Sequence, residues 1–210
     1  GGGADALARI VASKLGDALG QQVAVDNRPG AGATIAADAL AKSAPDGYTL
    51  LVMSNTHTTN ESLVPNKPFQ LLRDFEPVAG INYSDLVMVV HPSVPAKNLA
   101  EFIALAKARP GQILYGTAGV GAFQHLATSV FANMAGIKMT HVPYKGGGPA
   151  NTALVSGEVS SYFGSVSGSL PHIRSGRIRA LAVTGIKRSP GLPAVPTIAE
   201  TALPGYDITG

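Results

Sequence analysis

Short apolar segments alternate with amphipathic segments along most of this chain, and that alternation constrains its fold more than any other feature. Residues 86–90 (Leu-Val-Met-Val-Val) are typical of a buried strand, because the run is short, apolar and rich in β-branched side chains. A helix is expected next, since Asn98 and Glu101 have the spacing of a capping box. Such alternation indicates βαβ units and a mostly parallel sheet.

The same pattern extends over the rest of the chain. Strands are expected at residues 23–25, 48–53, 86–90, 113–115, 139–142, 160–163 and 179–183, and helices at 4–19, 34–42, 98–109, 122–134, 149–156 and 170–175. Prolines restrict the backbone between residues 82 and 95, where the strand at 86–90 runs into His-Pro-Ser-Val-Pro. Since each side of this stretch has its own strands and helices, we expect two α/β lobes.

Composition excludes several classes of function. The net charge is only +3 and no basic run is longer than two residues, so we expect no nucleic-acid partner. The absence of cysteine excludes disulfide scaffolds, thiolate zinc sites and cysteine nucleophiles. No stretch approaches the roughly 20 apolar residues of a membrane span. Because the chain begins with three glycines and not with Met and a signal peptide, we expect it to be a piece of a longer protein.

Three glycine-rich turns each lead into an expected helix. They are residues 1–5 (Gly-Gly-Gly-Ala-Asp), 117–122 (Thr-Ala-Gly-Val-Gly-Ala) and 144–149 (Tyr-Lys-Gly-Gly-Gly-Pro), the last including Lys145. In open α/β sheets ligands lie at such turns, where free backbone N–H groups at a helix start attract anions. Two interpretations stay open at this point: tight turns with no ligand, or turns that line a binding site.

Two further segments follow expected strands. Residues 54–60 are all polar and include Asn55, Thr56 and His57, which suits either recognition of a polar solute or a solvated loop. Gly164 and Ser165 end the strand at 160–163 and would face the same cleft.

Signatures of catalysis and of phosphate binding are weak. The Gly-Val-Gly at 119–121 lacks the third glycine of a dinucleotide fingerprint, and the chain has no Gly-Lys-Ser/Thr and no Gly-x-Ser-x-Gly. Of the five histidines only His57 has another ligand-type residue, Glu61, at a spacing of three to five residues, so we expect neither a metal nor a cofactor. His125 lies one turn into a helix after a glycine loop and is either a ligand contact or a structural histidine.

The chain resembles the periplasmic solute receptors of the tripartite tricarboxylate transporter family, the Bug-type binding proteins. Eight ordered motifs carry the resemblance: Gly-Gly-Gly-Ala-Asp at 1–5, Val-Asp-Asn-Arg-Pro-Gly-Ala-Gly at 25–32, Ala-Pro-Asp-Gly-Tyr-Thr-Leu at 44–50, Val-Val-His-Pro-Ser-Val-Pro at 89–95, Gly-Val-Gly-Ala-Phe-Gln-His-Leu at 119–126, His-Val-Pro-Tyr-Lys-Gly at 141–146, Leu-Pro-His-Ile at 170–173 and Arg-Ala-Leu-Ala-Val-Thr at 179–184.

The resemblance implies a two-lobed, flytrap-like receptor of the type II periplasmic-binding-protein architecture, without enzymatic activity and without a cofactor. It implies that residues 1–84 are a first lobe lacking its opening strand and its C-terminal part, that 85–206 are the second lobe, and that 207–210 begin a return crossover. It further implies a periplasmic monomer that captures a small organic carboxylate between its lobes and delivers it to a membrane permease.

The family's binding turns can be carried over residue by residue. The resemblance places the ligand against Gly2, Gly3 and Asp5 on one lobe and against Gly119, Gly121, Ala122 and His125 on the other. Family members often have Ser or Thr where Ala122 stands, and Asp-Asn where Gly164 and Ser165 stand. These departures favour a mono- or dicarboxylate, aromatic ones included, over an amino acid.

Two rival functions stay open. One is an α/β enzyme that acts on a small acid, with His125 or His57 as general base. The other is a sensory receptor for the same class of ligand.

Overall fold

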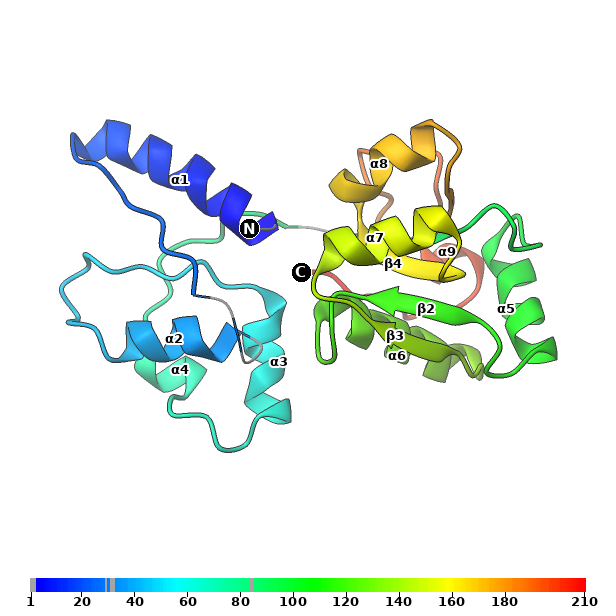
Figure 1. Cartoon of the computed structure of the whole chain (residues 1–210), viewed down its shortest axis with the longest axis horizontal. Helices are drawn as coiled ribbons and strands as arrows, with labels where there is room; N and C mark the ends of the chain where they lie inside the picture. Colours follow the sequence, from blue (N-terminus) through cyan, green and yellow to red (C-terminus); the bar gives the residue numbers. More distant parts are fainter. Residues whose placement is uncertain (1–2, 29, 31–32, 84) are drawn as a thin grey trace. The chain divides into compact units, whose positions relative to one another are not determined.

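The chain divides into two compact units, Gly1–Ala79 and Gly80–Gly210. The structure is a computed structural model that describes residues 3–28, 30, 33–83 and 85–210 (Figure 1). The division lies between residues 79 and 80, whereas the sequence places the boundary between 84 and 85.

A five-stranded mixed sheet forms the centre of the second unit. Its strands are β1 (Leu86–Val90), β2 (Leu114–Thr117), β3 (Thr140–Pro143), β4 (Ser161–Ser165) and β5 (Arg179–Val183), in the spatial order β3-β2-β4-β1-β5. β2 pairs in parallel with both β3 and β4, and β1 pairs antiparallel with β4 and β5, so this sheet is mixed and not mostly parallel as expected. The ends of β2, β3 and β4 therefore meet at one edge of the sheet.

Helices cover both faces of this sheet. They are α5 (Leu99–Ala108), α6 (Phe123–Ala135), α7 (Gly147–Ser156), α8 (Val166–Arg174) and α9 (Ile198–Thr201). Side chains of a strand alternate between faces, so Met88 and Val90 pack toward α5 and α6, and Val87 and Val89 toward α7. The central strand β1 is buried throughout because both of its faces are covered.

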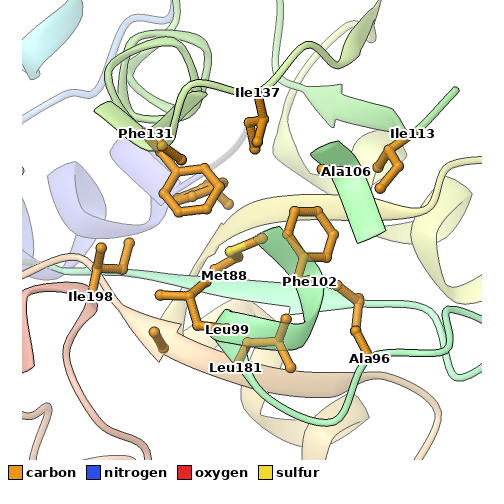
Figure 2. Close-up of a cluster of buried hydrophobic side chains, with 14 of the residues drawn as sticks. Met88, Ala96, Leu99, Phe102, Ala106, Ile113, Phe131, Ile137, Leu181 and Ile198 are labelled. Atoms are coloured by element: carbon orange, nitrogen blue, oxygen red, sulfur yellow. The ribbon is translucent and has the colours of Figure 1, made fainter. Parts of the chain in front are cut away.

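The core on the α5–α6 side is built around aromatic rings. Phe102 and Phe131 are fully buried and point toward one another beside Met88 (Figure 2). Phe131 also contacts Phe163 of β4 at 5.6 Å between ring centroids. Burial of one such side chain contributes about 1.5–3 kcal/mol, so this cluster stabilises the platform on which the site is built.

The first unit contains helices and, among its described residues, no strand. The helices are α1 (Gly3–Leu19), α2 (Thr34–Ala41), α3 (Asn55–Leu63) and α4 (Leu71–Asp74). The strands expected at 23–25 and 48–53 are therefore wrong: neither segment pairs with another described segment. A strand needs hydrogen-bonding neighbours as well as an apolar sequence.

Most expected elements of the second unit are confirmed. The strands at 86–90 and 179–183 have the bounds that the sequence predicts, and Asn98 caps α5 by accepting a hydrogen bond from the backbone N–H of Glu101. α8 begins four residues earlier than expected because the Ser165 hydroxyl caps it. Thr34 is the first residue of α2 and not its N-cap, which is Ala33.

Candidate functional site

Three helices of the second unit begin at the edge of the sheet where β2, β3 and β4 end. α6 follows β2, α7 follows β3, and α8 follows β4 directly. The first turn of a helix has N–H groups without an intrahelical partner, and the peptide dipoles place partial positive charge there. Because the three strands are parallel, this edge concentrates donors and positive potential suited to an anion.

The turn from β2 into α6 needs glycine at two positions. Gly119 has a φ of 136° and Gly121 a φ of 76°, a region that side-chain-bearing residues rarely adopt. Ala122 is the N-cap of α6, and its carbonyl accepts the first hydrogen bonds of the helix, from His125 and Leu126. The backbone therefore turns sharply. Because glycine has no side chain, neither Gly119 nor Gly121 covers the start of α6.

Backbone hydrogen bonds join the β2–α6 turn to the β3–α7 turn. The N–H of Tyr144 donates to the Thr117 carbonyl at 3.0 Å, and the N–H of Gly146 donates to the Ala118 carbonyl at 3.2 Å. Lys145 lies between these two donors and is exposed. The structure thus brings two glycine-rich turns of the sequence side by side, with a lysine at their rim.

The β4–α8 turn completes the edge. Gly164 is buried, whereas Ser165 is exposed, and the Ser165 hydroxyl accepts a hydrogen bond from the N–H of Gly168 at 3.3 Å. The Asn151 side chain of α7 donates to the Gly168 carbonyl at 3.1 Å, which ties α7 to α8. The Ser165 hydroxyl oxygen already accepts the capping hydrogen bond of α8. This turn therefore contributes to the edge through the exposed start of α8 and not through that oxygen.

Tyr162 links the starts of α6 and α7, and the sequence analysis does not find it. Its hydroxyl bonds to the Gln124 side chain of α6 and lies 3.1 Å from the position that a Cβ of Gly147 would take. Burial raises the pKa of Tyr162 to about 12, so the phenol is neutral and keeps its proton at physiological pH.

His125 and His141 are stacked beside the β2–α6 turn. Their ring centroids are 4.2 Å apart, and the Tyr115 ring stacks on His141 at 5.0 Å. Burial lowers the pKa of His125; burial and then the charge of His125 lower that of His141. His141 is missing from the predicted site because its position opposite Tyr115 follows only from the β2–β3 register.

The predicted site residues of the first unit have local roles. Gly3 is the first residue of α1, and Gly2 lies outside the described residues. The Asp5 carboxylate accepts a hydrogen bond from the Asn27 side chain at 2.8 Å and pairs with Arg9 at 3.0 Å. These partners, the Asn27 hydrogen bond first, lower the pKa of Asp5.

Asn55, Thr56 and His57 form the first turn of α3, so the interpretation of residues 54–60 as a loop after a strand is wrong. His57 is buried, and its Nδ1 accepts a hydrogen bond from the N–H of Ser54 at 3.2 Å. Burial lowers the pKa of His57. The polar run begins a helix because Ser54 and His57 form a capping box.

The described residues include neither a metal-binding cluster nor a membrane-spanning helix. Within residues 3–28, 30, 33–83 and 85–210, no group of three or more His, Asp or Glu side chains could hold a metal ion. None of the helices in that part of the chain is both long and apolar enough to cross a membrane.

Comparison with known proteins gives a consistent result. A sequence model described as "Tripartite tricarboxylate transporter family receptor" matches residues 7–209. "Protein BugT" of Bordetella pertussis is 42% identical over 208 residues, which are 98% of this chain and 64% of that protein. The chain spans 60% to 64% of the length of the first curated relatives that it matches.

Solved structures agree with the sequence matches. "R. palustris Rpa4515 with adipate" is 37% identical and superposes with a TM-score of 0.91, covering 99% of this chain and 70% of that one. "MatC (Rpa3494) from Rhodopseudomonas palustris with bound malate" is 31% identical with a TM-score of 0.88, covering 100% of this chain and 71% of that one.

Proposed function

Since the chain belongs to the tripartite tricarboxylate transporter family of receptors, we propose that it binds a small organic carboxylate and that the protein works as a receptor and not as an enzyme. One observation carries the proposal: the starts of α6, α7 and α8 converge at one edge of the sheet. Two matched structures are named with adipate and malate, and both compounds are dicarboxylates.

Backbone donors account for the chemistry of this site. A hydrogen bond to a charged acceptor contributes about 1.5–3 kcal/mol, so a few N–H groups suffice for micromolar binding, about −8.2 kcal/mol. Lys145 adds a positive charge at the rim, and the net charge of +3 favours anions over cations. Gly119, Gly121, Ala122 and Ser165 would contribute through the backbone of their turns, and Gly164 by leaving space beside Ser165.

The receptor acts, in this proposal, in the periplasm and hands its solute to a membrane permease. A matched structure named "Structure of a periplasmic transporter" supports the compartment, at 33% identity and a TM-score of 0.89. The contribution of Gly3, Asp5, Asn55, Thr56 and His57 in the first unit stays a prediction.

Titration calorimetry with a panel of mono- and dicarboxylates, adipate and malate included, tests the proposal. We expect micromolar binding of at least one compound with no turnover by mass spectrometry. Gly121→Ala and Gly111→Ala form a matched pair, because both glycines have a φ of 76° and only Gly121 lies at the site. Each substitution costs a similar roughly 1–2 kcal/mol of stability, but only Gly121→Ala should weaken binding. Failure of every carboxylate to bind would overturn the proposal.

A further inference from the structure

The glycine turn from β2 into α6 is held at both ends by histidine side chains. His141 Nε2 lies 2.6 Å from the Thr117 hydroxyl, which itself donates to the Gly119 carbonyl at 3.1 Å and accepts from the Gly119 N–H at 3.2 Å. His125 Nδ1 accepts a hydrogen bond from the N–H of Gly121 at 3.2 Å. Residues 117–121 therefore depend on one imidazole at their start and on another at their end.

The two imidazoles form one unit. Their planes are within 11° of parallel at a centroid distance of 4.2 Å, which joins β3 to α6 across the turn. Both rings are partly exposed, whereas Thr117 is fully buried. Solvent protons can therefore reach the histidines while the hydroxyl that they support stays dry.

We propose that His125 and His141 are positioning residues that hold the turn 117–121 in its binding form, and that protonation of His125 releases it. The donors at the start of α6 are useful only while Gly119 and Gly121 keep their left-handed conformations. The hydrogen bonds from the histidines and Thr117 keep them there.

The two hydrogen bonds respond differently to a proton. A protonated His125 Nδ1 would point an N–H at the Gly121 N–H, so that bond is lost. A protonated His141 can still donate from Nε2 to the Thr117 oxygen, while the hydroxyl donates to Gly119. His125 is therefore the residue that releases the turn. The charge of a protonated His125, 4.2 Å away, then opposes protonation of His141.

The neighbouring groups of the two histidines that the structure describes carry no negative charge that would stabilise a protonated imidazole. Tyr115 of β2 stacks on both rings, and burial raises the pKa of its phenol, so it stays neutral in acid. Gln124 and Ser129 on α6 are uncharged. Among the described residues, the only charge acting on either histidine is that of the other ring, namely His125 on His141. Burial favours the neutral form of both.

The experiment on the turn needs no ligand. In the full chain, the Gly121 amide resonance is followed by NMR from pH 7.5 to 5 together with the His125 ring. We expect the amide to shift with the titration of His125. His125→Asn places a non-titrating oxygen near the position of Nδ1, so the amide should keep its position at every pH. A Gly121 amide that does not respond while His125 titrates would overturn the proposal.

The coupling between the rings supplies the second test. The charge of His125 opposes protonation of His141, and His125→Asn removes that charge. We therefore expect the His141 ring to titrate at higher pH in His125→Asn than in wild type. An unchanged or lowered His141 midpoint would contradict the proposed coupling. His141→Gln places an amide near the position of Nε2 and keeps the Thr117 bond, so the Gly121 amide should titrate in this variant as it does in wild type.

The effect on affinity rests on the proposed function and uses adipate as the probe. Between pH 7.5 and 5.5, wild-type protein should lose about three- to tenfold more affinity than His125→Asn, the value of one hydrogen bond. Protonation of adipate itself is common to both proteins and cancels. If wild type instead kept or gained more affinity than His125→Asn on acidification, the positioning role would be overturned, because the imidazolium would then act on the ligand directly. If adipate binds neither protein, the proposed function loses support, and the Gly121 resonance still decides the role of the histidines.

Discussion

The two units treat similar apolar segments in opposite ways. In the second unit, β1 is buried at all five positions between covering helices. In the first unit, residues 48–53 have a comparable apolar pattern, yet Tyr48 is 94% exposed and Leu50 57% exposed. The segment adds no strand because, within the described residues, no neighbouring strand offers it hydrogen bonds. Pattern alone therefore predicts a strand only where the chain supplies its partners.

The same contrast applies to the helices. In the second unit, α6 packs Phe131 into the aromatic cluster and α7 packs Leu154 against the opposite face. In the first unit, α1 leaves Ile10 and Leu19 mostly exposed. We infer that the stability of the described fold is concentrated in the second unit, and four predictions test that inference.

The largest expected effect comes from the aromatic cluster. Phe131→Ala should lower the free energy of unfolding by about 3–5 kcal/mol, because it removes contacts with Phe102 and Phe163 and leaves a cavity. Leu72→Ala in the first unit should change it by less than about 0.5 kcal/mol, since that side chain is 97% exposed. Urea unfolding followed by circular dichroism measures both. Comparable losses in the two variants would show that Leu72 is covered in the protein and would break the comparison.

Glycine substitutions test how far each unit can adjust. A Cβ at Gly164 would lie 2.4 Å from the Ser169 hydroxyl and 2.7 Å from the Tyr162 ring, so Gly164→Ala should cost about 1–3 kcal/mol. A Cβ at Gly16 in α1 would lie 3.0 Å from the carbonyl of Gln21, an exposed residue that can shift. Gly16→Ala should therefore be neutral or gain up to about 1 kcal/mol of helix propensity. Thermal unfolding compares the two, and a stable Gly164→Ala protein would contradict tight packing at the end of β4.

Helix starts provide a smaller contrast. Asn98 accepts a hydrogen bond from the Glu101 N–H at 2.9 Å, and Asn98→Ala should cost about 1 kcal/mol. α2 of the first unit has Ala33 as its N-cap with a φ of 71°, a strained conformation for alanine. Ala33→Gly should gain about 0.5 kcal/mol, less than the strain relieved, because glycine is freer when unfolded. Denaturant midpoints measure both, and a loss in Ala33→Gly would show that this backbone is not strained.

Sequence reasoning predicted the second unit well because its signals are local. Helix-ending residues such as Gly136 and N-caps such as Asn98 lie within a few residues of the helices that they end or begin. The glycine turns of the site were found for the same reason. His141 and Tyr162 were missed because their roles depend on which strands are neighbours, and only the register β2–β3 and β2–β4 reveals that.

The first unit was predicted poorly for the converse reason. The expected strand at 48–53 depends on partners that the local sequence does not specify. The interpretation of residues 54–60 as a recognition segment or a solvated loop rests on the strand expected before them, although Ser54 and His57 have the spacing of a capping box. An imidazole replaces the usual carboxylate of that motif, so the helix start was overlooked.

That imidazole gives the smallest expected effect, a dependence of the first unit on pH. Burial lowers the pKa of His57 below 6.5, so folded protein stays neutral at this position while the unfolded chain takes up a proton. The stability it contributes is complete above pH 6.5 and is lost as the pH falls through the folded pKa. His57→Asn keeps an acceptor near the position of Nδ1 for the Ser54 N–H without titrating. Hydrogen exchange of the α3 amides, corrected for intrinsic rates, should show protection that falls on acidification in wild type and stays level in His57→Asn. If protection of the α3 amides fell equally steeply with pH in both proteins, the acid sensitivity of α3 would belong to a group other than His57.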